Sequence, residues 1–284
     1  METKQHNLWL LAALAAPLAH FTGCGWLTAA LTAAAVLPLA LVPRLWVFPK
    51  PFALAQILWL GLVAGVRRRG SAAYWPSDGS WAVPLTLLTL AALTNAAAAP
   101  RVGAVLAFAM GMVALPAAVS GAARMEPGWL VPVMGRWDPG LIAAFLLTCL
   151  PAAPGKGRLL PGIGLLAVVL AALVQGTLSP AVASAVSDPF YQTARALGHM
   201  EPIVAAALTL GWYAMATVLY GSAAQIAQNC GLGQRLPYVL VWGTATAAVL
   251  FGWQLSAPIL NGFNAFLWVL SPFFQKMKKV KNSA

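Results

Sequence analysis

The chain has 284 residues, of which 61% are hydrophobic and only 8% charged, and its mean hydropathy is +0.79. This composition excludes a soluble catalytic domain and predicts one polytopic membrane domain over residues 1–284. The net charge of +11 does not indicate nucleic-acid binding, because the basic residues are scattered over short loops and a lysine-rich tail.

The acidic residues are also informative, because none of the six lies inside an apolar segment. Charged side chains are costly within a bilayer and are found there mainly where they move ions or protons. The uncharged interior therefore argues against many pumps and membrane enzymes. The three cysteines lack the paired spacing of a metal site or disulfide framework, so we expect no metal and no cofactor.

About ten apolar stretches, bounded by proline, glycine and charged residues, follow one another along the chain. They cover residues 8–22, 26–43, 52–66, 81–99, 102–123, 140–153, 159–178, 203–228, 236–256 and 263–274. Several are shorter than the ~20 residues that a straight helix needs to cross a bilayer. We expect those helices to be broken, tilted or extended by their flanks.

The basic residues predict that both termini are cytoplasmic. In that orientation 11 of the 17 basic residues lie inside: Lys4, Arg44, Lys50, Arg101, Lys156, Arg158, Arg235, Lys276, Lys278, Lys279 and Lys281. The positive-inside rule favours this arrangement. One cluster, Arg67 to Arg69, would lie on the other side, after the third stretch.

The first apolar stretch runs into a glycine-rich interruption. Its candidate ligand-binding residues are Phe21, Thr22, Gly23, Cys24 and Gly25. Two glycines at membrane depth leave backbone groups without helical partners, which lipid tolerates only where protein buries them or they line a cavity. A plain turn between two helices and a close helix contact remain open alternatives. The pattern ending at Cys24 also resembles a lipoprotein signal, but the apolar chain that follows favours an uncleaved helix.

A second interruption lies at residues 134–140 and precedes the sixth apolar stretch. Its candidate ligand-binding residues are Arg136, Trp137, Asp138 and Gly140. Broken segments at corresponding positions of two halves are typical of an inverted repeat with a mid-membrane ligand site. We therefore predict an all-α, five-plus-five inverted repeat with broken first and sixth helices, its halves covering about 8–123 and 136–274. The alternative is an interfacial loop in which Arg136 and Asp138 are solvated.

The segment from Ser187 to Pro202 begins with Asp188-Pro189, which is a helix-entry signal. It leads into a long apolar stretch that contains Trp212 and Tyr213. Six of the twelve tryptophans lie near the ends of stretches, where such rings anchor in the interface. Trp212 lies deeper and is followed by a tyrosine, so both residues are candidates for the wall of a pocket.

Three collinear patterns suggest a family. They are Pro189-Phe190-Tyr191 with Arg195, Gly198 and Glu201, the Leu-x-Pro-x pattern within 126–133, and the Gly23-Cys24-Gly25 break. Together they resemble the spore-germination permease-like family, the integral-membrane B subunits of germinant receptors. The resemblance implies the amino acid, polyamine and organocation transporter superfamily, which has ten helices in two inverted repeats.

The leading hypothesis is a cell-membrane subunit that binds a small molecule, expected to be an amino acid, and signals to other membrane subunits of a receptor complex. Backbone groups at 21–25 and 136–140 would hold the ligand, with Trp212 and Tyr213 lining the pocket. A secondary transporter and a ligand-free assembly subunit with a degenerate transporter fold are the alternatives. A membrane enzyme is disfavoured because no HExxH pair, aspartate-rich phosphate motif or intramembrane Ser and His pair occurs.

Overall fold

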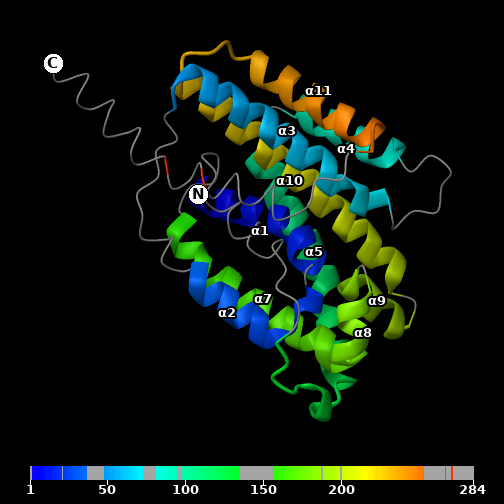
Figure 1. The fold of residues 1–284 in the computed structure, drawn as a ribbon. Coiled ribbons are helices and arrows are strands. Elements are labelled where there is room, and N and C mark those ends of the chain that lie inside the picture. Colours follow the sequence, from blue (N-terminus) through cyan, green and yellow to red (C-terminus); the bar gives the residue numbers. More distant parts are fainter. Residues whose placement is uncertain are drawn as a thin grey trace.

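The described part of the chain consists of helices joined by turns and irregular segments. The computed structural model describes all residues except 1, 21, 37–47, 73–80, 95–97, 135–155, 187, 199, 253–265, 267–269 and 271–284. Within these limits no strand occurs, which confirms the all-α prediction for this part of the chain. Figure 1 shows the resulting bundle of helices.

Helices and short 3-10 turns follow one another in chain order. They are α1 (Glu2–His20), η1 (Thr22–Cys24), α2 (Trp26–Val36), α3 (Lys50–Ala72), α4 (Ala82–Leu93), α5 (Ala99–Ala123), η3 (Pro127–Trp129), α7 (Lys156–Leu178), α8 (Pro180–Ala185), α9 (Pro189–Ala196), α10 (Glu201–Asn229) and α11 (Leu236–Leu250).

Three described helices are long and apolar enough to cross a membrane. They are Ala99–Ala123, Pro161–Leu178 and Glu201–Asn229, which belong to α5, α7 and α10. Shorter apolar segments lie in α2, α3, α4 and α11. The predicted stretch 140–153 and nearly all of 263–274 lie outside the described residues. Composition and helix length are consistent with an all-α membrane protein.

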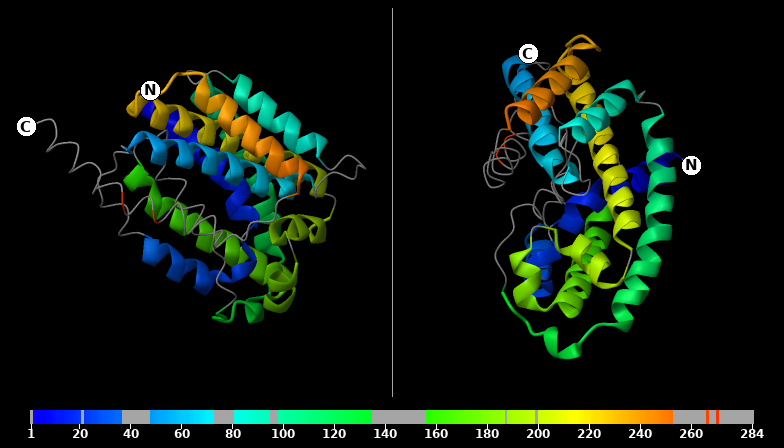
Figure 2. Two further views of the ribbon diagram at one scale, coloured as in Figure 1. Left: turned by 45° about the horizontal axis from the view of Figure 1, so that its top comes forward. Right: turned by 90° about the vertical axis from the view of Figure 1, so that its right-hand side faces the viewer.

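Helix α10 lies at the centre of the bundle. It packs against α1, α3, α4, α5, α9 and α11, and its Trp212 and Tyr220 are among the largest fully buried side chains. Beside it, α3 and α11 pack closely through glycine: a Cβ on Gly65 would lie 2.5 Å from the Ala245 carbonyl oxygen. Such contacts through small residues are typical of membrane helices. On the other side of the molecule α2 packs along α7 (Figure 2).

Two cavities lie near the two ends of α1, and they define the two ends of the molecule. At one end, called here the amino end, His6 of α1, Pro100 of α5 and Tyr238 of α11 line one cavity. At the other, called the glycine end, Gly23 of η1 and Ala183 of α8 line another. Helix α1 therefore runs from the amino end to the glycine end, as its place in Figure 1 shows.

Candidate functional site

The first predicted interruption is present in the structure. Helix α1 ends at His20, and a 3-10 turn and Gly25 separate it from α2, which begins at Trp26. Gly25 has a φ of +80°, in the left-handed region that favours glycine. Because α1 packs against α5 and α10 whereas α2 packs along α7, the turn redirects the chain between two parts of the bundle.

Close packing fixes the position of this turn. A Cβ on Gly23 would lie 2.4 Å from the Ala183 carbonyl oxygen and 2.7 Å from Cγ of Pro189. The first of these atoms belongs to the backbone, so a larger residue would have to displace α8. The glycine therefore allows η1, α8 and α9 to meet.

A buried glutamine on α7 joins three segments at the turn. The side chain of Gln175 is only 1% exposed. Its Nε2 donates to the carbonyl oxygens of Trp129 at 2.7 Å and Val131 at 2.8 Å. Its Oε1 accepts from the backbone N–H of Trp26 at 3.3 Å. One amide thus satisfies backbone groups that no helix or sheet pairs, as buried polar groups require.

Two further hydrogen bonds hold the segment that follows α5. The indole Nε1 of Trp26 donates to the Leu130 carbonyl oxygen at 3.2 Å. The backbone N–H of Glu126 donates to the Gly176 carbonyl oxygen at 2.9 Å. Residues 126–131 are therefore attached both to α2 and to the last turns of α7.

A cavity of about 570 Å³ lies beside the turn. Its walls come from the glycine turn, the segment after η3, α7 and α8. The lining residues are Gly23, Cys24, Gly25, Val133, Met134, Gln175, Pro180, Ala181, Ala183 and Ser184. None of these described residues carries a charge, so the polar groups of the wall come from backbone, amide, hydroxyl and thiol.

Helix α8 begins at this cavity with strained backbone. Ser179, which precedes α8, has a φ of +67°, and it is the one described non-glycine residue with positive φ. With its ψ of 154°, Ser179 lies in a region of backbone conformation that essentially only glycine adopts, which costs other residues about 1–3 kcal/mol. Strain of this kind is common at binding sites, where the surrounding structure holds it in place.

The predicted site residues divide into those at the cavity and those elsewhere. Gly23, Cys24 and Gly25 line it, whereas Thr22 is buried beside it and donates to the Ala19 carbonyl oxygen at 3.0 Å. The other predicted residues from the two interruptions lie outside the described residues: Phe21, Arg136, Trp137, Asp138 and Gly140. Met134, the first residue of the second interruption, and Val133 before it do line the cavity.

Trp212 and Tyr213 lie on α10 and do not line this cavity. Trp212 is 1% exposed within the core. The hydroxyl of Tyr213 is 2.6 Å from Oγ1 of Thr94, beyond the end of α4. The structure thus does not bring these two side chains to the glycine turn, and their part in ligand binding stays a prediction.

Sequence reasoning missed Gln175, which holds the site together. One signal was present: it is the one side-chain amide in the apolar stretch 159–178. An amide in such a stretch must find partners when it is buried. Its partners, however, are backbone groups far away in the sequence, which the sequence pattern alone does not reveal.

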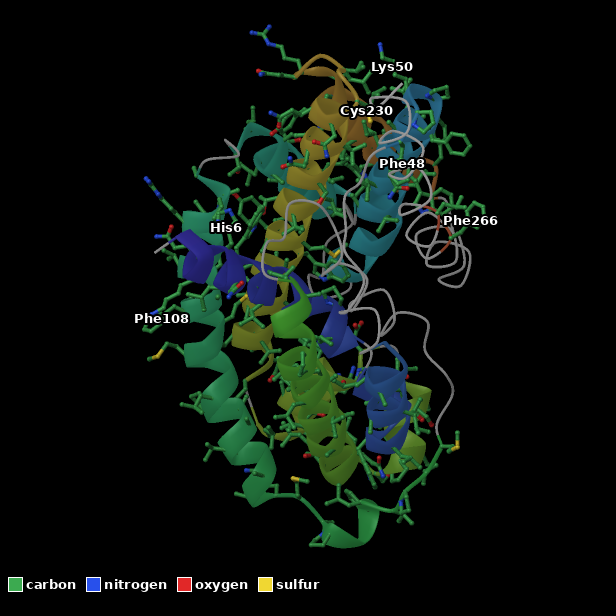
Figure 3. All side chains as sticks on the ribbon, turned by 90° about the vertical axis from the view of Figure 1, so that its left-hand side faces the viewer. His6, Phe48, Lys50, Phe108, Cys230 and Phe266 are labelled. Carbon is green, nitrogen blue, oxygen red and sulfur yellow. The ribbon has the colours of Figure 1, made fainter. Side chains whose placement is uncertain are left out.

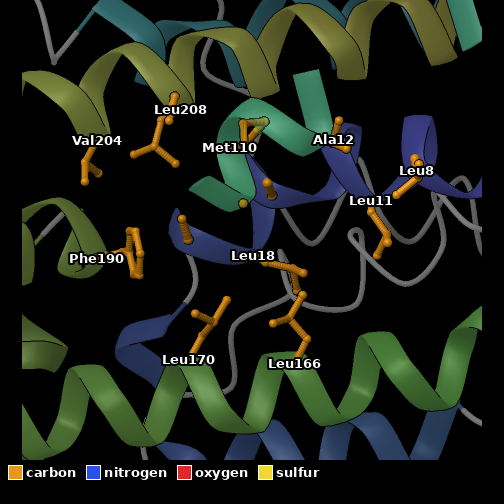
Figure 4. A pocket seen from close by; sticks show the side chains of 15 residues that line it. Leu8, Leu11, Ala12, Leu18, Met110, Leu166, Leu170, Phe190, Val204 and Leu208 are labelled. Carbon is orange, nitrogen blue, oxygen red and sulfur yellow. The ribbon is translucent and has the colours of Figure 1, made fainter. Parts of the chain in front are cut away.

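A second cavity, of about 290 Å³, is lined only by apolar residues of α1, α5, α7, α9 and α10 (Figure 4). Leu18, Leu166, Leu170 and Phe190 surround it in that view. Because its described walls offer no hydrogen-bonding side chain, a polar ligand entering it would lose its hydration without compensation. The cavity beside the glycine turn is therefore the better site for a polar ligand.

No protein-family model matches the chain, and no curated protein matches it. What the chain binds must therefore be inferred from its own residues and geometry.

Proposed function

We propose that the chain is a membrane-embedded subunit that binds a small molecule, with an amino acid as the expected ligand, in the cavity at the glycine end. The observation that carries this proposal is the interruption between His20 and Trp26 beside a cavity of about 570 Å³. Transporter-like proteins use such breaks in their helices, beside a cavity, to bind ligands.

The backbone groups at the turn suit a zwitterion. The N–H of Trp26 donates to Gln175, but the next two N–H groups of α2 have no intrahelical acceptors, and the first turn of this helix holds no acidic residue. Its N-terminus, directly after Gly25, favours a carboxylate. The backbone carbonyl groups of Gly23 and Cys24, two residues of the turn that line the cavity, are candidate acceptors for an ammonium group. An α-amino acid carries both charges, on groups attached to the same carbon.

The proposed architecture is the ten-helix inverted repeat, with halves of about 8–123 and 136–274. Val133 and Met134 support it, because the first residue of the second interruption and the residue before it line the same cavity as Gly23. Two broken segments that approach one cavity are the arrangement that inverted-repeat transporters show. In this arrangement Arg136, Trp137, Asp138 and Gly140 complete the ligand site.

We further propose that the amino end faces the cytoplasm. Four described cations lie there: Lys4, Lys50, Arg101 and Arg235. Lys50 lies at this end because Phe48, two residues before it, contacts the end of α10: the Phe48 carbonyl oxygen accepts a hydrogen bond from Sγ of Cys230 at 3.2 Å (Figure 3). At the glycine end Arg124 and Arg195 are accompanied by three acids: Glu126, Asp188 and Glu201. Arg67 to Arg69 are the exception to this distribution, because they lie near the end of α3, away from Lys50. An excess of positive charge marks the cytoplasmic side, and the C-terminal lysines favour the same side for that terminus.

The resemblance to the spore-germination permease-like family supports a sensing role. The three patterns that carry it meet at the glycine end: Gly23 lies against Pro189, and Trp26 beside the break donates to Leu130. Helices α9 and α10 begin within the pattern that starts at Pro189, at Pro189 and Glu201. We propose that the chain acts with other membrane subunits in a germinant-receptor-like complex that responds to a nutrient.

A thermal-stability screen of the purified full-length chain against the individual amino acids tests ligand binding. A ligand at 100 times its dissociation constant stabilises the folded state by about 2.7 kcal/mol, which is readily measured. An unchanged midpoint with every amino acid would contradict the proposal and favour a ligand-free assembly subunit. Flux into proteoliposomes then distinguishes the functions: saturable binding without accumulation supports sensing, whereas accumulation against a gradient supports a secondary transporter.

A further inference from the structure

The amino end carries two adjoining cavities with polar walls. One, of about 140 Å³, lies among α1, α4, α5, α10 and α11. The other, of about 550 Å³, lies among α4, α10 and α11. Thr94 and Tyr238 line both, so the two cavities are neighbours across these side chains.

Hydrogen bonds and aromatic contacts fix the inner wall. Nε1 of Trp9 donates to Oγ1 of Thr217 at 2.8 Å, and Thr94 donates to the Leu90 carbonyl oxygen at 2.8 Å. The rings of Tyr220 and Tyr238 are stacked, with centroids 5.8 Å apart. Side chains held in this way keep a binding surface formed before a ligand arrives, which lowers the entropic cost of binding.

The outer cavity offers uncharged hydrogen-bonding groups. The amides of Gln228 and Gln234 line it together with Tyr238. None of its described lining residues is acidic. Amide and phenol groups both donate and accept, so these walls suit a ligand that carries hydroxyl groups.

The chain around the cavities is positively charged. Arg101 follows the lining residue Pro100, Arg235 follows Gln234, and Lys4 lies two residues before His6. The side chains of Lys4, Arg101 and Arg235 are all exposed. Charge complementarity therefore selects an anion, because no described acidic residue lines either cavity.

Exposed hydrocarbon adjoins the outer cavity. Leu93, one of its lining residues, is 77% exposed, and Leu90 on the same helix is 50% exposed. On α11, Val239 is 64% exposed directly after Tyr238. A ligand that fits both surfaces has a polar head for the cavity and a hydrocarbon chain for the faces of α4 and α11.

We propose that the amino end binds an anionic phospholipid of the cytoplasmic leaflet, with a phosphodiester near Arg101 and Arg235 and headgroup hydroxyls on the amides of Gln228 and Gln234. The proposal rests on the cytoplasmic placement of this end. It is independent of the ligand site at the glycine end. Cytoplasmic leaflets are rich in anionic lipids, and basic residues at their surface attract them.

Lipid binding to the full-length chain in an uncharged detergent tests this proposal. Native mass spectrometry measures the affinities for phosphatidylglycerol and phosphatidylcholine of matched acyl chains. We expect the wild-type chain to prefer phosphatidylglycerol. Arg101→Gln and Arg235→Gln should each weaken its binding about fivefold, the effect of one basic residue near an anionic surface. Gln228→Leu should also weaken it, although the charge is unchanged.

Arg195→Gln is the matched control, because Arg195 is an exposed arginine at the glycine end. It should change the affinity less than twofold. Equal losses in all three arginine variants would mean attraction to the whole charged surface and would overturn the proposal. An unchanged affinity in Gln228→Leu would also overturn the proposal. Displacement of the lipid by equimolar glycerol phosphate would overturn it too, because it would assign the site to a soluble phosphate. Unchanged thermal midpoints of the variants would show that they fold.

Discussion

The amide of Gln175 gives the sharpest test of how the glycine end is built. Gln175→Met keeps the length of the side chain but removes three hydrogen bonds, to Trp129, Val131 and Trp26. Each hydrogen bond contributes about 0.5–1.5 kcal/mol net. The bond to Trp26 is long, at 3.3 Å, so its share lies at the low end. We expect a loss of about 3 kcal/mol in the free energy of unfolding, or roughly a hundredfold in the unfolding equilibrium.

Reversible unfolding in mixed micelles, followed by tryptophan fluorescence, measures this loss. Gln225→Met is the matched control, because Gln225 is an exposed glutamine on α10. It should unfold within about 0.5 kcal/mol of the wild-type chain, as surface substitutions usually do. If Gln175→Met and the control unfold alike, Gln175 does not hold residues 126–131 and α2 together, and this description of the site is wrong.

Two further predictions concern backbone positions. A Cβ on Gly103 would lie 2.2 Å from Cδ1 of Trp9, whereas one on Gly111 of the same helix would meet no heavy atom within 4 Å. Gly103→Ala should therefore destabilise the chain by about 2 kcal/mol, and Gly111→Ala should stabilise it by about 0.5 kcal/mol. Equal thermal midpoints of the two variants would contradict this packing of α1 on α5. Ser179→Gly relieves the backbone strain at a residue with positive φ and should stabilise the chain by up to about 1 kcal/mol. Ser184→Gly, within α8, should destabilise the chain by a similar amount. The reverse order of stabilities in the same unfolding assay would show that Ser179 is not strained.

The helical class and several helix boundaries could be predicted from the sequence. Apolar composition and charge placement predicted membrane helices, and the predicted starts at 26 and 236 coincide with those of α2 and α11. Gly23 and Gly25 were identified because glycine leaves a direct local signal. The boundary of α9 at Pro189 was likewise predicted from Asp188-Pro189.

The composition of the site wall could not be predicted in the same way. Gln175 acts through backbone groups 44 and 46 residues away in the sequence, and no local pattern marks such contacts. Trp212 was chosen because an aromatic ring deep in an apolar stretch suits a pocket, but the same property suits the core, where Trp212 is buried. Pairing between distant segments depends on the tertiary fold, which a single sequence does not specify locally.

Ligand binding to the cavity at the glycine end is the central claim, and two neighbouring residues of α8 allow a direct measurement. Ala181 lines the cavity, whereas Val182 is 46% exposed and does not. Tryptophan at either position adds the same side chain to the same helix. The measurement is equilibrium binding of the radiolabelled amino acid that most stabilises the wild-type chain. We predict that Ala181→Trp abolishes binding and Val182→Trp leaves it within twofold of wild type. Equal affinities in the two variants would contradict ligand binding at the glycine turn.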